Sequence, residues 1–449
     1  MAARVLANHF EKVTLLERDA EIDERQPRKG VPQGRQFHAL LTSGLGILAG
    51  YFPGFIEELS ADGVDSLAFP EELRWFQYGS WKNRAPCDLV IYPEARVRLE
   101  GRLRARVRKL RGVKIQTGSK VEALEFDCEQ VTGVRLTQDG RAESISADLI
   151  VDASGRGSQI VKWLRAAGYP APPCETMEVD MVSVTRIYWK TAGIRDWKAI
   201  GVHPLPALAR GGHLFPLDAE RWIVTLFGYL GEHPPADPEG FLLFARTLST
   251  PDLYEAIASA VPAGEIVRSR YSRQTRHRFD RVERFPAGLL LIGDAMCSFD
   301  PVFGQGMSVA CKEARALDQL LGLQKPNAIL WKDYFRRCRS ILNLPWMLTL
   351  CEGLRFPRMK GRRTLKIRFL QWYTGHLFSL SATNPQVCGA FLKVLHLEAA
   401  EPVLFHPAIV MRVLLRALRG WSAAPPPLSY EPMRRPSKYI HDLTPDTAD

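Results

Sequence analysis

Residues 289–314 combine residue types that suit the binding of a flat or anionic ligand. The stretch reads LLLIGDAMCSFDPVFGQGMSVACKEA, and its polar and turn-forming members are Gly293, Asp294, Pro301, Gly304, Gln305, Gly306 and Met307. The carboxylate of Asp294 can accept a hydrogen bond from a ligand hydroxyl. A glycine-rich turn before a helix offers free backbone N–H groups and the positive end of the helix dipole. The alternative is a surface turn with incidental glycines, and the ordered set of residues favours the ligand site.

The elements around these residues follow from the apolar pattern. The run 289–292 is too short for a helix and suits a buried strand, and a helical pattern extends over 307–321. Two further predicted strands, in KVTLLE and ADLIVDASGRGS, end in the acids Glu17 and Asp152. An acid at the end of a parallel strand can bind a ribose hydroxyl. Each acid alone could be an ordinary charged strand end, so the prediction depends on their order along the chain.

In this order the motifs resemble those of the class A FAD-dependent monooxygenases, which have the para-hydroxybenzoate hydroxylase fold. The chain is similar to the epoxidase-like branch of that family. The resemblance covers residues 1–320 by motif and extends more loosely through the helical region beyond. It implies a cofactor-binding role for the set from Gly293 to Met307. Asp294 would bind the ribityl chain of FAD, and the Gly304–Met307 backbone would face the pyrimidine edge of the flavin ring.

Four residues elsewhere acquire roles through the same resemblance. Glu17 would bind a ribose hydroxyl, and Arg35 would lie near the FAD phosphates and ring. Arg96, in an Arg-x-x-Leu-Glu element, would pack beside the adenosine and pyrophosphate. Asp152 belongs to a motif implicated in both FAD and NAD(P)H binding, but Ala-Ser-Gly follows it here, which weakens the nicotinamide inference more than the flavin one. The alternative for Glu17 is an ordinary charged strand end, and the alternative for Arg35 is a surface arginine. His38 is interpreted as structural rather than catalytic.

The first residues lack one expected unit. MAARVLANH resembles the middle of an amphipathic helix with no cap before it. In the fold that the resemblance implies, a strand and a G-x-G-x-x-G turn precede this helix and seat the pyrophosphate. We consider two interpretations and favour the first: Met1 is an internal methionine with the true start upstream, or the chain really lacks this unit and does not hold FAD.

Composition limits the class of protein. The 449 residues suit two or three domains, and 46% hydrophobic with 24% charged residues is ordinary for a soluble protein. Eight scattered cysteines without a CxxC pair, and ten dispersed histidines, predict a cytoplasmic protein without a metal site. The net charge of +11 is concentrated in 96–111 and 355–368. Such clusters can meet nucleic acid or anionic lipid, but a solvated helix face is favoured for the first, and no nucleic-acid partner is predicted.

The predicted fold class is α/β. It comprises a doubly wound, Rossmann-like FAD-binding domain, an inserted antiparallel-sheet substrate domain and a helical C-terminal region. The FAD-binding domain is assigned to 1–69, 96–165 and 280–325, the substrate domain to 70–95 and 166–279, the helical region to 326–422, and a flexible tail to 423–449. Helices are expected at 326–343, 363–380, 386–398 and 402–419. They either cap the substrate cavity, which is the default, or make peripheral contact with a membrane.

The resemblance implies an FAD-dependent monooxygenase. It would use NAD(P)H, O2 and a flavin C4a-hydroperoxide to epoxidise or hydroxylate an apolar olefinic or aromatic small molecule. Because the flavin carries the difficult chemistry, no catalytic acid or base is assigned. The alternatives are a flavin-dependent reductase of isoprenoid double bonds and a truncated, flavin-free binding protein. A halogenase would need a lysine beside a Trp-x-Trp-x-Ile-Pro element, which the sequence lacks.

Overall fold

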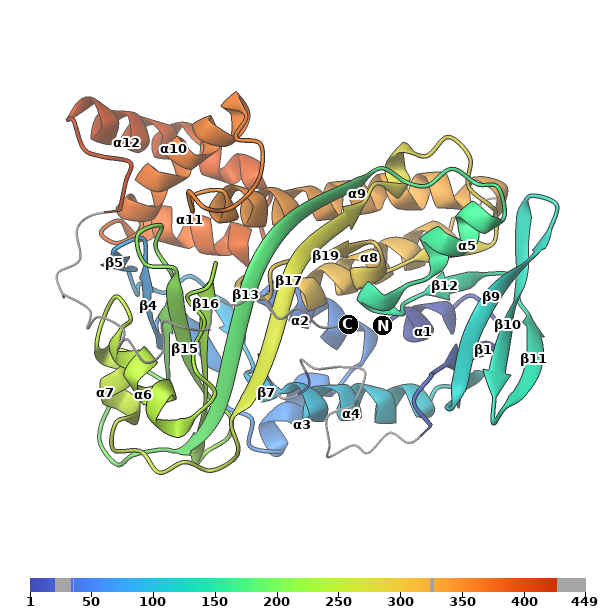
Figure 1. Ribbon diagram of the computed structural model, residues 1–449, viewed down its shortest axis with the longest axis horizontal. Coiled ribbons are helices and arrows are strands. Elements are labelled where there is room, and N and C mark those ends of the chain that lie inside the picture. The colour runs from blue at the N-terminus through green and yellow to red at the C-terminus, as the bar shows by residue number, and fades with distance from the viewer. Residues whose placement is uncertain (21–33, 35, 324–326, 426–449) are drawn as a thin grey trace.

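A computed structural model describes residues 1–20, 34, 36–323 and 327–425. It shows the predicted α/β class, with strands and helices alternating in the first half and helices dominating after α8 (Gly306–Leu321) (Figure 1). The helical lobe lies at one end of the molecule, and the meander of β9 (Ser119–Asp127), β10 (Gln130–Gln138) and β11 (Arg141–Ser146) lies at the other. The turn at Asp139-Gly140 joins β10 to β11, and both residues have positive φ, 50° and 78°.

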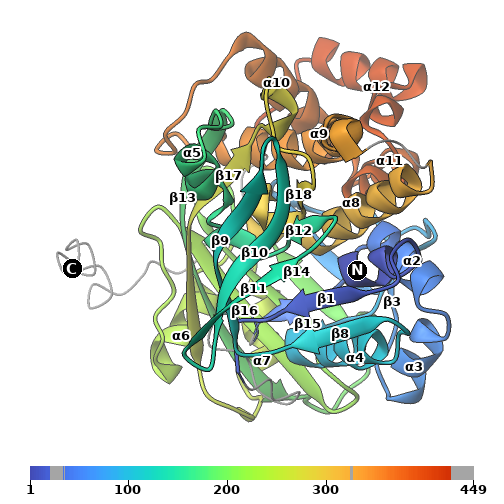
Figure 2. The same ribbon diagram turned by 90° about the vertical axis from the view of Figure 1, so that its right-hand side faces the viewer.

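The parallel strands of the nucleotide-binding part form two pairs. β1 (Val13–Leu16) pairs with β8 (Val113–Gln116), and β12 (Ile150–Asp152) pairs with β18 (Leu289–Leu291). In the described part of the chain no backbone ladder joins the two pairs. Helix α1 (Ala2–Leu6) contacts α8, which also packs on α2 (Thr42–Tyr51). Figure 2 shows β1 and β8 side by side, close to the three-stranded meander.

An eight-stranded sheet forms the second layer, in the order β19-β17-β13-β16-β15-β14-β4-β5. Its two longest strands, β13 (Cys174–Trp189) and β17 (Val267–His277), run antiparallel across the molecule (Figure 1). The others are β4 (Leu73–Gln77), β5 (Ser80–Trp81), β14 (Ala199–Val202), β15 (Arg210–Pro216), β16 (Arg221–Tyr229) and β19 (Cys297–Ser298). All its pairs are antiparallel except β14 with β4. One face packs on α6 (Pro238–Arg246) and α7 (Asp252–Ile257).

The remaining elements connect these layers. They are α3 (Phe55–Ala61), α4 (Arg96–Arg108), α5 (Ile160–Ala166), and the short pairs β2 (Phe37–His38) with β7 (Glu94–Ala95) and β3 (Leu67–Phe69) with β6 (Leu89–Ile91). The C-terminal lobe consists of α9 (Asn327–Gly353), α10 (Leu365–Leu380), α11 (Pro385–Leu395), the 3-10 turn η6 (Glu401–Phe405) and α12 (Pro407–Leu418). None of the helices in the described ranges is long and apolar enough to cross a membrane.

Two predicted helix boundaries are wrong. The helix expected from 402 begins as the 3-10 turn η6, and α12 starts at Pro407. The helix expected to end at 343 continues through Pro345 to Gly353. Proline usually interrupts a helix because it lacks an N–H and crowds the preceding turn. Here Trp346 and Cys351 beyond the proline are buried, at 4% and 5% exposure. Their burial in the core favours continuation of the helix despite the missing hydrogen bond.

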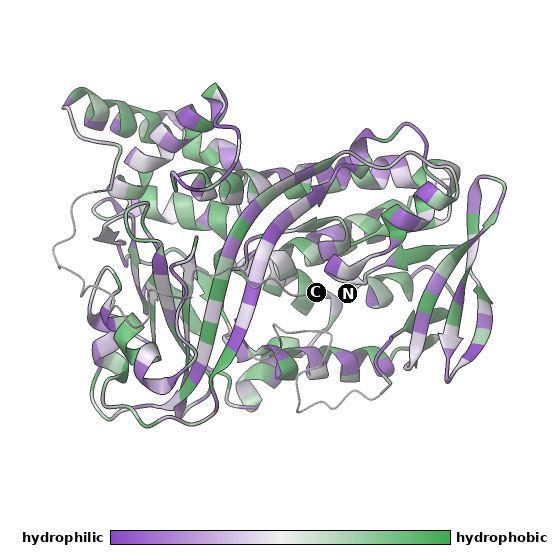
Figure 3. Ribbon diagram, viewed as in Figure 1, coloured by the Kyte–Doolittle hydropathy of each residue, from purple (hydrophilic) through white to green (hydrophobic). Residues whose placement is uncertain are grey.

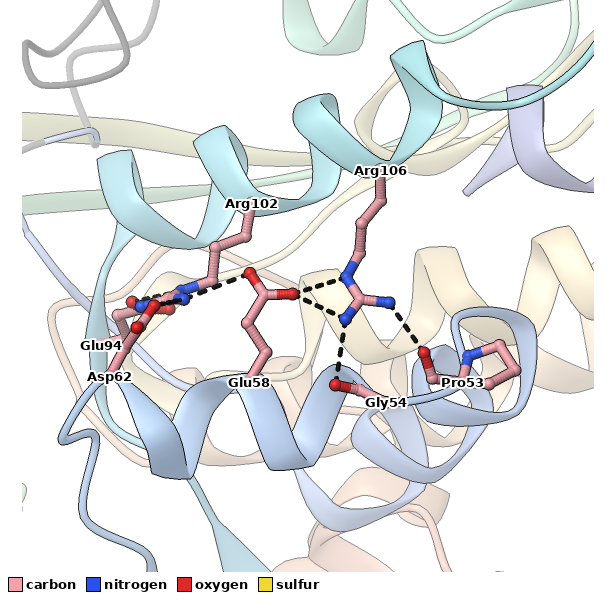
Figure 4. Close-up of polar contacts among 7 residues, drawn as sticks. All are labelled: Pro53, Gly54, Glu58, Asp62, Glu94, Arg102 and Arg106. Carbon is pink, nitrogen blue, oxygen red and sulfur yellow. Dashed lines mark hydrogen bonds and ion pairs between the residues drawn. The ribbon is translucent and has the colours of Figure 1, made fainter.

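The solvated face predicted for the basic helix α4 is present only in part: Arg98, Arg108 and Lys109 are exposed, whereas two other arginines are paired with acids. Arg102 contacts the carboxylates of Glu58, Asp62 and Glu94, and its side chain is only 11% exposed (Figure 4). Arg106 pairs with Glu58 and donates to the carbonyls of Pro53 and Gly54 (Figure 4).

These acids hold the pKa of Arg102 above its ordinary value, although burial alone would lower it. Ion pairs with α3 and β7 therefore account for part of this basic cluster.

Candidate functional site

The strand, turn and helix predicted around Asp294 are present. β18 ends at Leu291, a 3-10 turn η4 (Gly293–Ala295) follows, and a second one, η5 (Pro301–Phe303), leads to α8. Gly293 and Gly304 have φ of 67° and 65°, in the left-handed region that glycine adopts at little cost. The helix begins one residue before the predicted Met307. The turn therefore presents the N-terminus of a sixteen-residue helix to the space in front of it.

A cavity of about 1010 Å³ lies between this turn and the eight-stranded sheet. Polar groups gather at one side of it, from the residues Arg96, Ser154, Arg156, Asp294, Gln305 and Gly306. Aromatic and aliphatic side chains also line it, and six of them form what we call the apolar wall: Trp75, Phe215, Phe227, Leu348, Phe391 and Leu395. The cavity thus brings polar groups and apolar side chains together within a single space.

Asp294 provides the carboxylate of the polar side. Its side chain is accessible, and this accessible surface faces the cavity. The surrounding protein raises the pKa of the carboxyl by desolvation, whereas the nearby cations Arg156 and Arg96 lower it. Gly155 lies alongside, since a Cβ placed on it would be 3.9 Å from the Cβ of Asp294. The parallel pairing of β12 with β18 brings this loop and the Asp294 turn together.

A buried acid that was not predicted from the sequence forms a hydrogen bond to the backbone of this turn. Glu313, on α8, has no exposed surface, and its Oε2 accepts a hydrogen bond from the N–H of Gly293 at 2.7 Å. Burial raises its pKa to about 8, and the negative charge of Asp294 acts in the same direction. Glu313 therefore carries a proton at neutral pH and fixes the residue that precedes Asp294.

Asp300 fixes the second turn. It is 5% exposed and caps η5, because its Oδ1 accepts a hydrogen bond from the N–H of Val302 at 3.1 Å. Its Oδ2 accepts a second one from the hydroxyl of Tyr229, on β16, at 2.9 Å. Burial raises the pKa of Asp300 to about 6. This contact ties the turn before α8 to the eight-stranded sheet across the cavity wall.

The predicted site residues fall into three groups. Gly293, Asp294, Pro301, Gly304, Gln305, Gly306 and Met307 all line the cavity, together with Arg96. Arg96 lies at the first turn of α4, and its Nη1 contacts the sulfur of Met307. This contact joins two predicted elements that are 211 residues apart in the chain.

Asp152 and Glu17 sit at the predicted strand ends but not on the cavity surface. The carboxylate of Asp152 accepts hydrogen bonds from Ser154 N at 2.8 Å and Ser158 Oγ at 2.5 Å, so it organises the loop that lines the cavity. Glu17 accepts one from Asp19 N at 3.1 Å, beside Arg18, which does line the cavity. Arg35 lies outside the described residues. The binding roles of these three residues stay predictions.

Histidines in the apolar wall were not predicted. His203 and His213 both line the cavity, with ring centroids 5.3 Å apart, and His203 faces Phe303 at 6.5 Å. Desolvation lowers the pKa of both rings, that of His213 to about 4, so both are neutral at physiological pH. A neutral imidazole offers one donor and one acceptor. The pair adds polar atoms beside the apolar wall, as Gln77, Ser183 and Thr225 of the same sheet also do.

Comparisons with known proteins identify the class. The model of the FAD binding domain family matches residues 1–326. Protein Rv3254 of Mycobacterium tuberculosis is 29% identical over 94% of this chain and 92% of its own length. The 3-(3-hydroxy-phenyl)propionate/3-hydroxycinnamic acid hydroxylase of Burkholderia cenocepacia is 30% identical, but over only 45% of this chain and 34% of that protein.

Solved structures show the same fold at low sequence identity. The flavin-dependent brominase Bmp2 has a TM-score of 0.66 at 14% identity, over 93% of this chain and 96% of that one. The 2-methyl-3-hydroxypyridine-5-carboxylic acid oxygenase has a TM-score of 0.57 at 19% identity, over 95% of each chain. The protein belongs to the FAD-binding family of class A flavoprotein monooxygenases. It is an FAD-dependent monooxygenase, and FAD is its cofactor.

The cavity residues fit this cofactor. The side-chain oxygen Oε1 of Gln305 is buried without a hydrogen-bond partner among the described residues, whereas its amide nitrogen donates to the carbonyl of Leu395 at 3.0 Å. The free oxygen is an acceptor for a ligand N–H at the start of α8. The Gly306 backbone is open, since an added Cβ would meet nothing within 4 Å. Asp294, this amide oxygen and the helix N-terminus together suit a ligand with hydroxyl, N–H and anionic groups.

Proposed function

We propose that this monooxygenase inserts one oxygen atom from O2 into an apolar olefinic or aromatic small molecule, with NAD(P)H as the reductant. The observation that carries the proposal is the single cavity, in which the Asp294 turn faces a wall of aromatic side chains. A site of this kind holds a polar cofactor and an apolar substrate in one water-poor space. Epoxidation and hydroxylation both fit this arrangement.

The chain's own groups would hold the cofactor and orient the substrate. Asp294 would accept from the ribityl hydroxyls, and the amides of Gly304–Met307 would stabilise negative charge on the flavin ring. Arg96, which lines the cavity, would meet the anionic parts of FAD. When bound and reduced, FAD would supply the chemistry that activates O2 for transfer to the substrate. Glu17, Arg35 and Asp152 keep the binding roles that the family resemblance implies, and we keep the predicted domain boundaries as part of the proposal.

The two cavity histidines favour a substrate that carries a hydroxyl group. A neutral imidazole of His203 or His213 can accept a hydrogen bond from a phenolic hydroxyl, which raises the electron density of the ring that is attacked. The partial relatives named as hydroxylases of 3-hydroxyphenyl compounds support hydroxylation of such an aromatic ring. Epoxidation of an olefin remains the second candidate, because aromatic and aliphatic side chains also line the cavity.

The proposal also covers the cellular location of the protein and its contact with a membrane. We propose a cytoplasmic enzyme whose C-terminal helices make peripheral contact with a membrane. Such contact would bring the cavity close to a store of apolar substrate.

Turnover under isotopically labelled O2 tests the proposed reaction. The purified protein is supplied with FAD, with NADH or NADPH, and with a panel of olefins and hydroxyaromatics. The expected result is substrate-stimulated oxidation of the nicotinamide and one labelled oxygen atom in the product. Saturated product formed without O2 would instead identify the reductase. Absence of bound flavin would identify the flavin-free binding protein.

A further inference from the structure

The C-terminal lobe concentrates the exposed apolar surface of the protein. Fifteen large hydrophobic side chains are exposed in the described part of the chain, and ten of them lie between residues 365 and 421. The ten are Leu365, Phe369, Trp372, Val403, Phe405, Met411, Leu414, Leu415, Leu418 and Trp421. Figure 3 shows hydrophobic positions along the outer helices of this lobe, which project from one end of the molecule. A soluble monomer rarely exposes apolar side chains in such a group without a partner for them.

These side chains belong to adjoining elements. On α12, Met411, Leu415 and Leu418 are exposed at helical spacing, whereas Ile409 and Val413 are buried. Helix α12 therefore has one face in the core and an apolar face outside it.

Helix α10 contacts α12, and aromatic rings connect it to η6. The ring of Tyr373 lies 6.3 Å from Phe369 and 4.8 Å from Phe405, and its hydroxyl donates to the carbonyl of Leu404. The exposed residues of α10, η6 and α12 thus form one outer surface, which we call the lobe surface.

Positive charge surrounds the lobe surface. Residues 355–421 contain eleven Lys and Arg against two acids, Glu398 and Glu401. Arg362, Lys366 and Arg368 are exposed next to Leu365 and Phe369, and none of the three has a carboxylate of the described residues within ion-pair distance. This contrasts with Arg102 and Arg106 of α4, which are paired with acids.

We propose that the lobe surface docks on an anionic phospholipid bilayer. Apolar side chains flanked by unpaired cations are the combination that interfacial helices use, since the apolar groups enter the acyl boundary while Lys and Arg meet lipid phosphates. Charge complementarity favours this occupant over a second copy, because two copies would bring the same cationic cluster face to face.

The lobe surface also adjoins the cavity. Phe391 and Leu395 of α11 line the apolar wall, and α11 contacts both α10 and η6. A bilayer on the lobe surface would therefore lie one helix layer from the substrate compartment. This docking specifies the membrane contact proposed above. The delivery role rests on the proposed oxygen-insertion reaction, whereas lipid binding does not depend on that reaction.

Vesicle flotation tests the proposal with the full chain. The protein is mixed with vesicles of phosphatidylcholine, or of equal parts phosphatidylcholine and phosphatidylglycerol. Flotation is expected with the anionic vesicles and is expected to weaken at high salt. Two double variants test the two parts of the lobe surface. Leu414→Glu with Leu418→Glu changes its apolar side chains, and Lys366→Gln with Arg368→Gln removes two of its positive charges. The first should abolish flotation, and the second should weaken binding by about five-fold for each charge removed.

Ile194→Glu is the matched control, because Ile194 is a fully exposed apolar residue far from this lobe in the sequence. It should float as the wild type does. The proposal would be overturned if all variants floated equally with the anionic vesicles, or if the wild type did not float with them. The proposal would also be overturned if the wild type formed a dimer that does not bind vesicles and the Leu414→Glu, Leu418→Glu variant were monomeric. Vesicle binding that appears only after residues 426–449 are removed would overturn it as well. Flavin absorbance, measured on each sample, reports the proposed function separately.

Discussion

The N–H of Gly293 donates to the buried carboxyl of Glu313 at 2.7 Å, so the residue before Asp294 is held from inside helix α8. The hydrogen bond crosses from the turn to the second turn of the helix that follows it. It makes the position of Asp294 depend on a side chain that does not line the cavity. Glu313 is therefore a positioning residue for the proposed cofactor site.

Glu313→Gln is expected to remove a pH-dependent component of stability. A carboxyl whose pKa rises on folding binds its proton more tightly in the native state, so stability is lost as pH rises from 4.5 through about 8. Near the upper end of this range the glutamine variant should be more stable than the wild type by at least about 1 kcal/mol. Urea unfolding across the range measures this difference, with the exposed Glu398→Gln as the control. Parallel stability profiles for wild type and Glu313→Gln would contradict the assignment.

Asp300→Ala is expected to loosen the turn before α8. The change removes the cap of η5 and leaves the buried hydroxyl of Tyr229 without its acceptor. Loss of a cap and of a buried hydrogen bond should each cost about 1 kcal/mol of unfolding free energy. Tyr229→Phe removes only the second contact and should cost about half as much. Equal costs for the two variants, measured by urea unfolding, would show that the cap contributes nothing.

Gly44→Ala is expected to destabilise the packing of α2 on α8. An added Cβ would lie 2.3 Å from Oγ and 2.7 Å from the Cα of Ser308, and the latter is backbone. Overpacking of this kind costs about 1–3 kcal/mol. Gly46→Ala, in the same helix, meets nothing within 4 Å and should stabilise by about 0.5–1 kcal/mol. Thermal unfolding of the two variants should move in opposite directions, and a common direction would refute the close approach of Gly44 to Ser308.

His213→Phe is expected to weaken binding of hydroxylated ligands selectively. The phenylalanine keeps the ring in the cavity wall and removes its hydrogen-bonding nitrogen atoms. A phenol should bind the FAD-loaded enzyme about five- to ten-fold more weakly, in line with the loss of one hydrogen bond. Perturbation of the flavin spectrum measures this affinity, and the matching hydrocarbon should bind equally to both proteins. An equal loss for phenol and hydrocarbon would indicate a change of shape rather than of recognition.

The local parts of the site could be predicted from the sequence. The turn with Gly293, Asp294 and Gly304 depends on short-range chemistry, because an apolar run, positive-φ glycines and a helix start lie within a few residues of one another. Glu313 was missed, although it interrupts the apolar stripe of Val309, Ala316 and Leu320, which are buried on the same helix face. A charged residue within such a stripe is a signal that could have revealed it.

The non-local parts could not be predicted. His203 and His213 meet only because β14 pairs with β15, with Gly201 opposite His213, and no local pattern specifies that register. The Tyr229 to Asp300 contact likewise joins residues 71 positions apart. The end of α9 was misplaced because burial outweighed the local preference of Pro345. Long-range packing decided each of these cases.

Titration of the flavin-free protein with FAD, in wild type and in Asp294→Ala, tests the central claim most directly. The claim is that the Asp294 turn holds the cofactor in the cavity. Loss of a hydrogen bond to a charged group should weaken FAD binding by roughly ten-fold or more, with an unchanged unfolding curve. Asp148→Ala removes an exposed carboxylate that does not line the cavity, and it should bind FAD as the wild type does. Equal FAD affinity for wild type and Asp294→Ala would contradict the account.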